Sequence, residues 1–193
     1  MQLKWEKSEY HDKNAGALEY MEQRYGEKFE YVGLKRSAFY DPNSRSIFVS
    51  CESLPGKEIL VEIIKDGKEE KYYDNYMEYY FENQVNDFII DLAKNYFYDA
   101  TFKSSITAVA LNSSIDMTTT FAEYICSKYY FVRGHLDVIG ESNEETVRKF
   151  ADELVTRGIQ FSISVNIPSI NEGYNIRYFD EDDEIYIRRR TLK

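Results

Sequence analysis

The residues best suited to chemistry are His135 and Asp137, which stand two positions apart in an apolar stretch. On a strand, side chains two positions apart share a face, so the imidazole and the carboxylate would be neighbours. Together with a serine, such a pair could form a hydrolytic triad. The Gly-x-Ser-x-Gly motif is absent, however, and the serines are scattered along the chain. We therefore interpret the pair as ordinary surface neighbours and predict no catalytic residue.

A second group of charged residues lies near the C-terminus. Asp180–Glu184 is a run of carboxylates, but a calcium loop also needs a glycine for its sharp bend, and that glycine is missing. The run is therefore interpreted as a solvated acidic turn. Arg188–Arg190 either pairs with this turn across a hairpin or reaches a phosphate. On a strand, three consecutive arginines alternate between faces, which makes a poor nucleic-acid stripe.

The chain offers few ligands for a transition metal. It has two histidines, His11 and His135, and two cysteines, Cys51 and Cys126, which match no metal or Cys-x-x-Cys spacing. Two buried free thiols are the expected state of the cysteines. A disulfide between them is the alternative, and it would require an oxidising compartment. We predict no cofactor and no metal.

Charge restricts the classes of partner. The chain has 34 acidic and 24 basic side chains and a formal charge of −10, which opposes binding to a phosphate backbone and favours a basic partner. No apolar run approaches the roughly 18–20 residues that cross a bilayer, so no transmembrane segment is expected. The N-terminus also lacks a signal-like hydrophobic segment, which leaves the compartment open because exported proteins lose theirs.

The stretch from Leu60 to Phe97 has the clearest local pattern. Ile59–Ile64 is a β-branched run that stops at Asp66-Gly67, a pair typical of a hairpin turn, after which Tyr72-Tyr73 can pair back. Asn75 with Glu78 matches a capping box and opens a predicted helix that runs to Phe97. Its apolar stripe has helical spacing and consists of Phe81, Val85, Phe88, Ile89, Leu92 and Tyr96.

The first half of the chain is predicted to read helix, three strands, helix. Asn14 or Asp12 caps a helix with Ala17, Tyr20, Met21 and Tyr25 on one face, and Gly26 ends it. The expected strands are Phe29–Val32, Ser46–Cys51 and Glu58–Lys65, separated by turns that contain Pro42 and Pro55-Gly56.

In the second half, Ser142–Arg190 shares the order of Asn14–Lys65, a capped helix followed by three strands. Asp99–Asp116 has no clean period, although Ile106–Leu111 could be a strand, and Thr118 or Thr119 opens a short helix through Ser127. Extended chain is expected at 129–139 with a bend at Gly134. Ser142 with Glu145 forms a capping box for the helix Asn143–Arg157. The predicted strands that follow are Ile159–Val165, Tyr174–Phe179 and Glu184–Arg190.

These elements predict an α+β fold in which amphipathic helices pack on antiparallel meander sheets. No Pro/Gly/Ser-rich linker divides the chain, which favours one compact domain over residues 1–193. The shared order also allows two similar halves of one helix and three strands, at 14–97 and 116–190.

Tyrosine supplies the main functional hypothesis. The chain has 18 Tyr and 12 Phe against one Trp, and tyrosine suits both half-exposed sheet faces and interaction surfaces. The leading hypothesis is a non-enzymatic domain that binds a protein or peptide, for example an immunity-type protein that occludes a basic toxin. The alternatives are an enzyme or ligand carrier with a Tyr-lined pocket beneath the helix Asn75–Phe97, and self-association. The candidate binding residues are Tyr72, Tyr73, Tyr76, Tyr174, Tyr178 and Tyr186.

The run Ala17–Gly26, followed by Phe29–Val32 and Asp74–Tyr76, resembles small uncharacterised proteins of Gram-positive gut bacteria. Many of these look like lipoproteins or secreted domains in which a helix packs on a meander. The resemblance covers the chain to about Phe97 and its motifs are structural. It implies an extracytoplasmic setting and no known activity, although no lipobox cysteine lies near the start of this chain.

Overall fold

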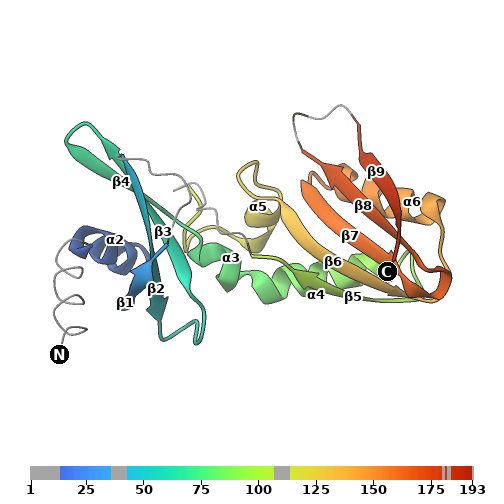
Figure 1. Cartoon of the computed structure of the whole chain (residues 1–193), viewed down its shortest axis with the longest axis horizontal. Coiled ribbons are helices and arrows are strands. Elements are labelled where there is room, and N and C mark those ends of the chain that lie inside the picture. The colour runs from blue at the N-terminus through green and yellow to red at the C-terminus, as the bar shows by residue number, and fades with distance from the viewer. Residues whose placement is uncertain (1–13, 36–42, 107–113, 180, 182–183, 193) are drawn as a thin grey trace. The chain divides into compact units, whose positions relative to one another are not determined.

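The computed structural model describes residues 14–35, 43–106, 114–179, 181 and 184–192 (Figure 1). Its contacts divide the chain into two compact units. Unit 1 contains Met1–Tyr80 and Thr107–Thr119, and unit 2 contains Phe81–Ile106 and Thr120–Lys193. The fold is α+β, as predicted, with one sheet in each unit. The expected single domain, or halves at 14–97 and 116–190, stays a prediction.

Unit 1 holds a four-stranded antiparallel meander, which confirms the predicted strands and the pairing of Tyr72-Tyr73 with the strand before it. Gly67 has a φ of 66° in the hairpin between the last two strands, where glycine meets no steric penalty. The strands are β1 (Phe29–Leu34), β2 (Ser44–Cys51), β3 (Ile59–Asp66) and β4 (Glu69–Asp74).

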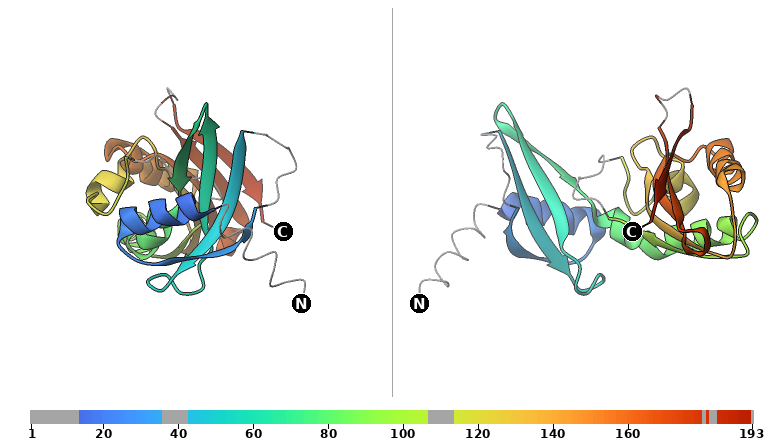
Figure 2. Two further views of the ribbon diagram at one scale, coloured as in Figure 1. Left: turned by 90° about the vertical axis from the view of Figure 1, so that its left-hand side faces the viewer. Right: turned by 45° about the vertical axis from the view of Figure 1, so that its right-hand side comes forward.

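Helix α2 (Ala15–Tyr25) lies across one face of this sheet (Figure 2). It buries Ala17, Leu18, Met21 and Tyr25 and ends at Gly26, whose φ of 72° is the left-handed conformation expected from the sequence. The core of unit 1 forms between this helix and the alternate strand residues that face it, among them Ile47, Val61 and Ile63.

The predicted helix Asn75–Phe97 is wrong in two respects, because it is interrupted at Phe81 and ends at Ala93. It consists of α3 (Tyr76–Tyr80) in unit 1 and α4 (Glu82–Ala93) in unit 2. The aromatic contacts explain the break. Tyr76 stacks on Tyr25 at 4.0 Å between ring centroids, whereas Phe81 packs on Tyr124 at 4.7 Å in the other unit. A uniform apolar stripe therefore serves two separate cores.

Unit 2 holds a five-stranded sheet in the order β5-β6-β7-β8-β9. The predicted antiparallel meander is wrong at one position, because β6 pairs with β7 in parallel. Such a pair needs a long crossover, and helix α6 (Glu144–Thr156) provides it. The strands are β5 (Asp99–Ser104), β6 (Val132–Ile139), β7 (Phe161–Ile167), β8 (Glu172–Tyr178) and β9 (Tyr186–Thr191).

Several local predictions in unit 2 need correction. Strand β5 was not predicted, and most of the expected strand Ile106–Leu111 lies outside the described residues, as does most of the acidic run Asp180–Glu184. Gly134 does not bend the chain but lies within β6, where a Cβ atom would stand 2.4 Å from the carbonyl oxygen of Lys103. Glycine is needed there because two strands approach closely.

The helix caps of unit 2 also differ from those predicted. Asn143, not Ser142, caps α6 by accepting a hydrogen bond from the Thr146 amide at 3.0 Å. The short helix α5 (Phe121–Ile125) begins one residue later than expected, with a capping box between Thr120 and Glu123. A 3-10 turn, η1 (Pro168–Ile170), follows β7.

Both cysteines are free, as expected, but neither is buried. Cys51 is half-buried at the end of β2 in unit 1, and Cys126 is exposed at the end of α5 in unit 2. Cys51 shares the face of the buried residues Ile47 and Val49 on β2 but lies at the end of the strand, and Cys126 follows the last residue of the five-residue helix α5. Among the described helices, none is long and apolar enough to span a membrane.

Candidate functional site

The two faces of the unit 2 sheet differ sharply. Residues that point inward, such as Leu136, Ile163 and Val165, are buried, and helices α4 and α6 contact the sheet from that side (Figure 2). The opposite face carries polar and charged side chains that are exposed or half-exposed. We call it the basic face, and it consists of Asp99, Thr101, Lys103, Arg133, His135, Asp137, Ile139, Ser162, Ser164, Asn166, Asn175, Arg177, Tyr186, Arg188 and Arg190.

Strand register arranges these side chains in rows across the sheet. The three central rows read Lys103–His135–Ser164–Asn175–Arg188, Thr101–Asp137–Asn166–Gly173–Arg190 and Arg133–Ser162–Arg177–Tyr186. Lysine and arginine occupy five of these positions, and Asp137 is the only carboxylate among them. The row beyond Asp137 adds a second carboxylate, Asp99, which pairs with Ile139. Cations therefore outnumber carboxylates five to two on this surface, in a chain whose formal charge is −10.

Lateral hydrogen bonds tie part of the basic face together. Asn166 donates from Nδ2 to Asp137 Oδ1 at 2.5 Å and accepts from the Arg190 guanidinium at Oδ1. Gly173 lies beneath this arginine, since a Cβ atom there would stand 3.0 Å from Arg190 Cζ. On the neighbouring row, Ser164 Oγ donates to the side-chain oxygen of Asn175 at 3.0 Å.

Aromatic rings and guanidinium groups meet at one end of the basic face. The Arg133 Cζ atom lies 3.8 Å from the centre of the Phe131 ring, and Phe131 meets Phe179 edge-on at 5.1 Å. The Arg177 Cζ atom lies 5.6 Å from the centre of the Phe179 ring and 5.2 Å from the centre of the Tyr186 ring. Such cation–π contacts hold the arginines in place while leaving their charge at the surface.

The same face tests the idea of a hydrolytic site. Register places Ser164 directly beside His135 on the neighbouring strand, which the sequence could not show. However, Ser164 donates to Asn175, and Asp137 accepts from Asn166. Each group is thus bonded along the sheet rather than to the histidine, and His135 and Asp137 are exposed. The geometry favours a polar surface over a triad.

The predicted tyrosines do not form one site. Tyr72, Tyr73 and Tyr76 belong to unit 1, and Tyr174, Tyr178 and Tyr186 belong to unit 2. Tyr76 and Tyr174 are buried, Tyr72, Tyr73 and Tyr178 are half-buried, and Tyr186 is 46% exposed. Of the three in unit 2, Tyr186 alone lies on the basic face.

The arginine run behaves as strand alternation predicts. Arg188 and Arg190 point to the basic face, and Arg189 points to the other side, where it pairs with Glu172. Glu172 also accepts from the Tyr174 hydroxyl at 2.8 Å, and this bond lowers the pKa of the carboxyl. Burial together with this carboxylate raises the pKa of Tyr174 to about 12. The basic face was missed because its other cations come from three separate strands.

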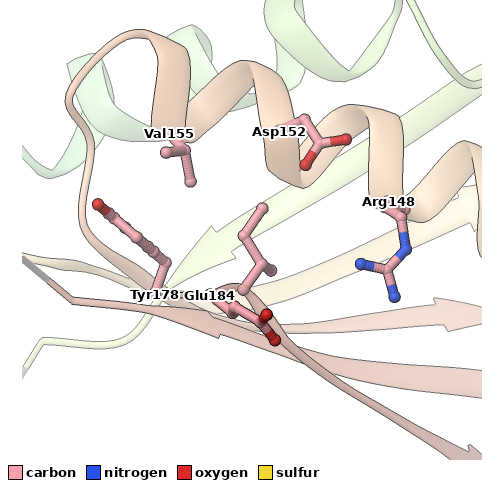
Figure 3. A pocket seen from close by; sticks show the side chains of 6 residues that line it. Arg148, Asp152, Val155, Tyr178 and Glu184 are labelled. Carbon is pink, nitrogen blue, oxygen red and sulfur yellow. The ribbon is translucent and has the colours of Figure 1, made fainter. Parts of the chain in front are cut away.

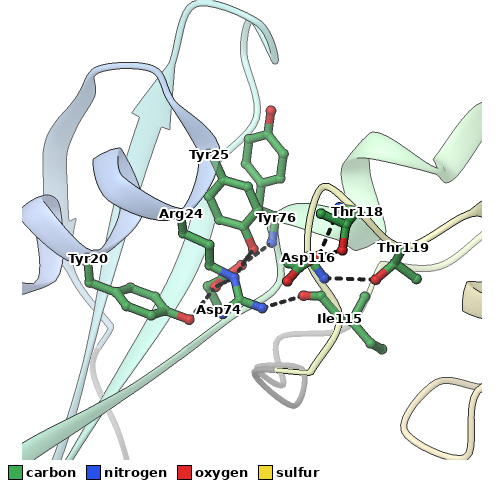
Figure 4. Close-up of polar contacts among 9 residues, drawn as sticks. All are labelled: Tyr20, Arg24, Tyr25, Asp74, Tyr76, Ile115, Asp116, Thr118 and Thr119. Atoms are coloured by element: carbon green, nitrogen blue, oxygen red, sulfur yellow. Dashed lines mark hydrogen bonds and ion pairs between the residues drawn. The ribbon is translucent and has the colours of Figure 1, made fainter.

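Unit 1 contains a polar cluster built around Asp74, which is 4% exposed (Figure 4). The carboxylate accepts from the Tyr25 hydroxyl at 2.7 Å, from the Tyr20 hydroxyl at 3.1 Å and from the Tyr76 amide at 2.9 Å. Arg24 Nε lies 3.7 Å from the same carboxylate and donates to the Tyr25 hydroxyl at 3.0 Å. The cluster thus joins α2 to the junction of β4 and α3.

Arg24 extends this cluster to a third segment of unit 1. Its guanidinium donates to the Ile115 carbonyl oxygen, next to a turn in which Asp116 accepts from Thr118 (Figure 4). Burial raises the pKa of Asp74 even though its hydrogen bonds oppose the shift. Burial and the nearby carboxylate likewise raise the pKa of the Tyr25 hydroxyl. We assign this cluster a structural role, because its polar groups satisfy one another.

A smaller cluster lies beside it. Glu27 Oε1 accepts from the Ser53 hydroxyl at 2.6 Å and from the Tyr76 hydroxyl at 2.8 Å. Partial burial opposes ionisation of Glu27, but these hydrogen bonds together lower its pKa. Burial raises the pKa of Tyr76 to about 12.

Among the described residues, no group of three or more His, Cys, Asp or Glu side chains could hold a metal ion.

Unit 2 also has a shallow pocket of about 450 Å³ between α6 and the chain that flanks the β8–β9 connection (Figure 3). Arg148, Asp152 and Val155 line it from the helix. Tyr178 lines it from the end of β8, and Glu184 and Ile185 line it from the segment just before β9. It has one tyrosine and is open to solvent, so it differs from the Tyr-lined pocket that the sequence suggested. It offers no cluster of converging catalytic groups.

The chain has a weak structural similarity to a known protein. A solved structure of a DUF5037 family protein from Ruminococcus gnavus ATCC 29149 is similar over 91% of this chain and 90% of that chain, with 10% sequence identity and a TM-score of 0.40. No protein-family model and no curated protein matches the sequence.

Proposed function

We propose that this chain is a non-enzymatic interaction domain that binds a partner protein through the basic face of unit 2. The observation that carries the proposal is the segregation of charge. Five cations share one open sheet face with two carboxylates, Asp99 and Asp137, in a chain with a net charge of −10. Keeping like charges together costs stability through repulsion, so such a surface is typical of recognition.

The chemistry of the face supports binding rather than catalysis. Its serine, asparagine and aspartate side chains form hydrogen bonds with side chains of neighbouring strands. His135 is exposed to solvent. Arginine and tyrosine, which dominate the energetics of protein interfaces, occur together at Arg177 and Tyr186. The expectation of a basic partner followed from net charge alone. The charge of this face favours an acidic partner instead.

The test uses the full chain and a matched pair of variants. In Arg188→Glu/Arg190→Glu, two cations of the basic face are reversed. In the control Lys94→Glu/Lys149→Glu, the net charge changes equally, but both lysines are exposed near or on helices that pack on the opposite side of the sheet. Partners are captured on the tagged chain from the cells that produce it and are measured again with purified proteins.

We expect a captured partner whose dissociation constant rises at least tenfold with the Arg188/Arg190 variant and less than twofold with the control. Circular dichroism checks that both variants keep their fold. A partner that binds both variants equally well, or that protects only unit 1 from hydrogen exchange, would overturn the proposal.

A further inference from the structure

The layout of the basic face also indicates what kind of partner segment it fits. Its middle strand, β7, presents the short side chains Ser162, Ser164 and Asn166. Longer cations stand to either side, on β5 and β6 and on β8 and β9. An extended chain could therefore approach the middle of the sheet closely while the cations reach its side chains. This step rests on the proposed function.

The spacing of the cations matches a polypeptide. Arg188 and Arg190 stand two residues apart on β9 and share a face. Successive side chains on one face of a strand are roughly 6.6–6.8 Å apart, and the same holds for an extended ligand. Carboxylates at alternate positions of a bound segment would therefore lie opposite successive arginines, where charge-assisted hydrogen bonds are the strongest.

Apolar groups flank the cations at both ends. At the end where β6 stops, Ile139 is 54% exposed beside its strand partner Asp99, whose side chain is also exposed, and the preceding residue, Tyr98, is 93% exposed. At the other end lies Tyr186, which is 46% exposed. Tyr186 lies in the row of Arg133, and Ile139 is six residues from Arg133 along β6, so the two apolar ends are about 20 Å apart along the strands, or about six residues of extended chain.

The two phenylalanine rings beside Arg133 are poorly placed to stack on nucleic-acid bases. Single-stranded nucleic acid binds by stacking bases on open aromatic faces. Here the Arg133 guanidinium covers the face of Phe131 at 3.8 Å, and Phe179 is held edge-on against that ring. Ile139 offers no ring at all. A protein ligand can supply aliphatic and aromatic side chains next to carboxylates, whereas a nucleic acid supplies phosphates and bases. The surface therefore fits a protein ligand better.

We infer that the basic face binds an extended acidic peptide segment that carries an apolar residue at each end of its run of carboxylates. The cations pair with the carboxylates, and the two apolar ends contact Ile139 with Tyr98 and Tyr186.

Fluorescence anisotropy with defined probes tests this inference. The probe is a labelled peptide of about five glutamates flanked by a leucine and a tyrosine, a length set by the strand spacing. Two comparison probes are the same peptide with alanine at both flanks and an oligothymidylate of similar charge. We expect the flanked peptide to bind at least tenfold tighter than either. Arg188→Glu/Arg190→Glu should weaken it at least tenfold and Ile139→Ala severalfold, with no change in Lys94→Glu/Lys149→Glu.

The outcomes separate this inference from the proposed function. Tighter binding of oligothymidylate would overturn both, because the face would then be a nucleic-acid surface. Equal binding of the two peptides would reject the inferred contacts of the apolar end residues with Ile139, Tyr98 and Tyr186. If no probe binds but a captured protein still depends on Arg188 and Arg190, the proposed function stands and the extended acidic segment is rejected.

Discussion

At the scale of single residues, unit 1 depends on a carboxylate that is removed from water and compensated by tyrosine hydroxyls. Asp74 lies opposite Val61 on the inner face of its sheet, where strand register would ordinarily place an apolar side chain. A carboxylate is tolerated at this position because three side chains of α2, Tyr20, Arg24 and Tyr25, contact it. A buried charge with these partners is costly to disturb.

The first prediction concerns Tyr25→Phe. The change removes a donor to Asp74 and an acceptor for Arg24 but keeps the ring, so the carboxylate loses a hydrogen bond without a change of shape. Because hydrogen bonds to charged groups contribute roughly 1.5–3 kcal/mol, we expect the free energy of unfolding to fall by about 2 kcal/mol. Urea denaturation measures this. The control Tyr98→Phe, at a residue that is 93% exposed, should leave stability unchanged.

The second prediction is a pH dependence. The native pKa of Asp74 is raised above its ordinary value of 3.8 because the group is buried. Between those two pKa values the native state binds more protons than the unfolded state, so the contribution of this group to stability grows as the pH falls through that window. The stability of the natural chain relative to Asp74→Asn should therefore increase from pH 7 toward pH 4. A flat difference, or one that decreases, would contradict the assignment.

At the scale of elements, helix α6 shows how two neighbouring candidates for one cap can differ. The sequence favoured Ser142 because Glu145 completes the capping-box spacing. The structure uses Asn143, and Glu145 instead pairs with Lys149 at 2.7 Å along the helix. Within the described part of the chain, the buried Ser142 hydroxyl has no hydrogen-bond partner.

The third prediction separates these two caps. Asn143→Ala removes the acceptor of the Thr146 amide and should lower the free energy of unfolding by about 1 kcal/mol, the usual value of an N-cap. Ser142→Ala should be neutral or slightly stabilising, because it removes a buried hydroxyl without a partner. Thermal and urea unfolding of the two variants measure both changes. The reverse order of effects would restore Ser142 as the cap.

At the scale of the whole molecule, charge is distributed unevenly. The chain as a whole has a formal charge of −10, whereas the basic face of unit 2 carries more cations than carboxylates. Interactions between exposed charges fade beyond roughly 8–10 Å at physiological salt. A polyanion close to this face therefore experiences its cations more strongly than the distant carboxylates.

The fourth prediction follows from that screening. At pH 7 and moderate salt, the full chain should be retarded on immobilised heparin even though its sequence pI is about 4.8. Arg188→Glu/Arg190→Glu should abolish the retardation, and Lys94→Glu/Lys149→Glu should preserve it. Retention volumes on one column under identical salt gradients give the measurement. Passage of the natural chain without delay would show that the net charge outweighs the local surface.

Prediction from sequence succeeded where the pattern is local. The spacing of Ala17, Met21 and Tyr25 with Gly26 defined helix α2, and alternation in Phe161–Val165 defined β7. It failed where a long-range contact decides. Phe81 continues a helical stripe that predicts one helix, but its ring belongs to a different core from that of Tyr76. Strand β5 was missed because only its pairing with β6 makes its alternation meaningful.

The sequence by itself determined the α+β class, most elements and the alternation of Arg188, Arg189 and Arg190, because these follow from side-chain period and turn chemistry. Tertiary structure alone decided which cations share a surface. Lys103, Arg133, Arg177 and Arg188 come from four strands, and the parallel pairing of β6 with β7 brings them to one face. Strand order and register depend on how separate segments bury their apolar sides against one another, and no local pattern records that choice.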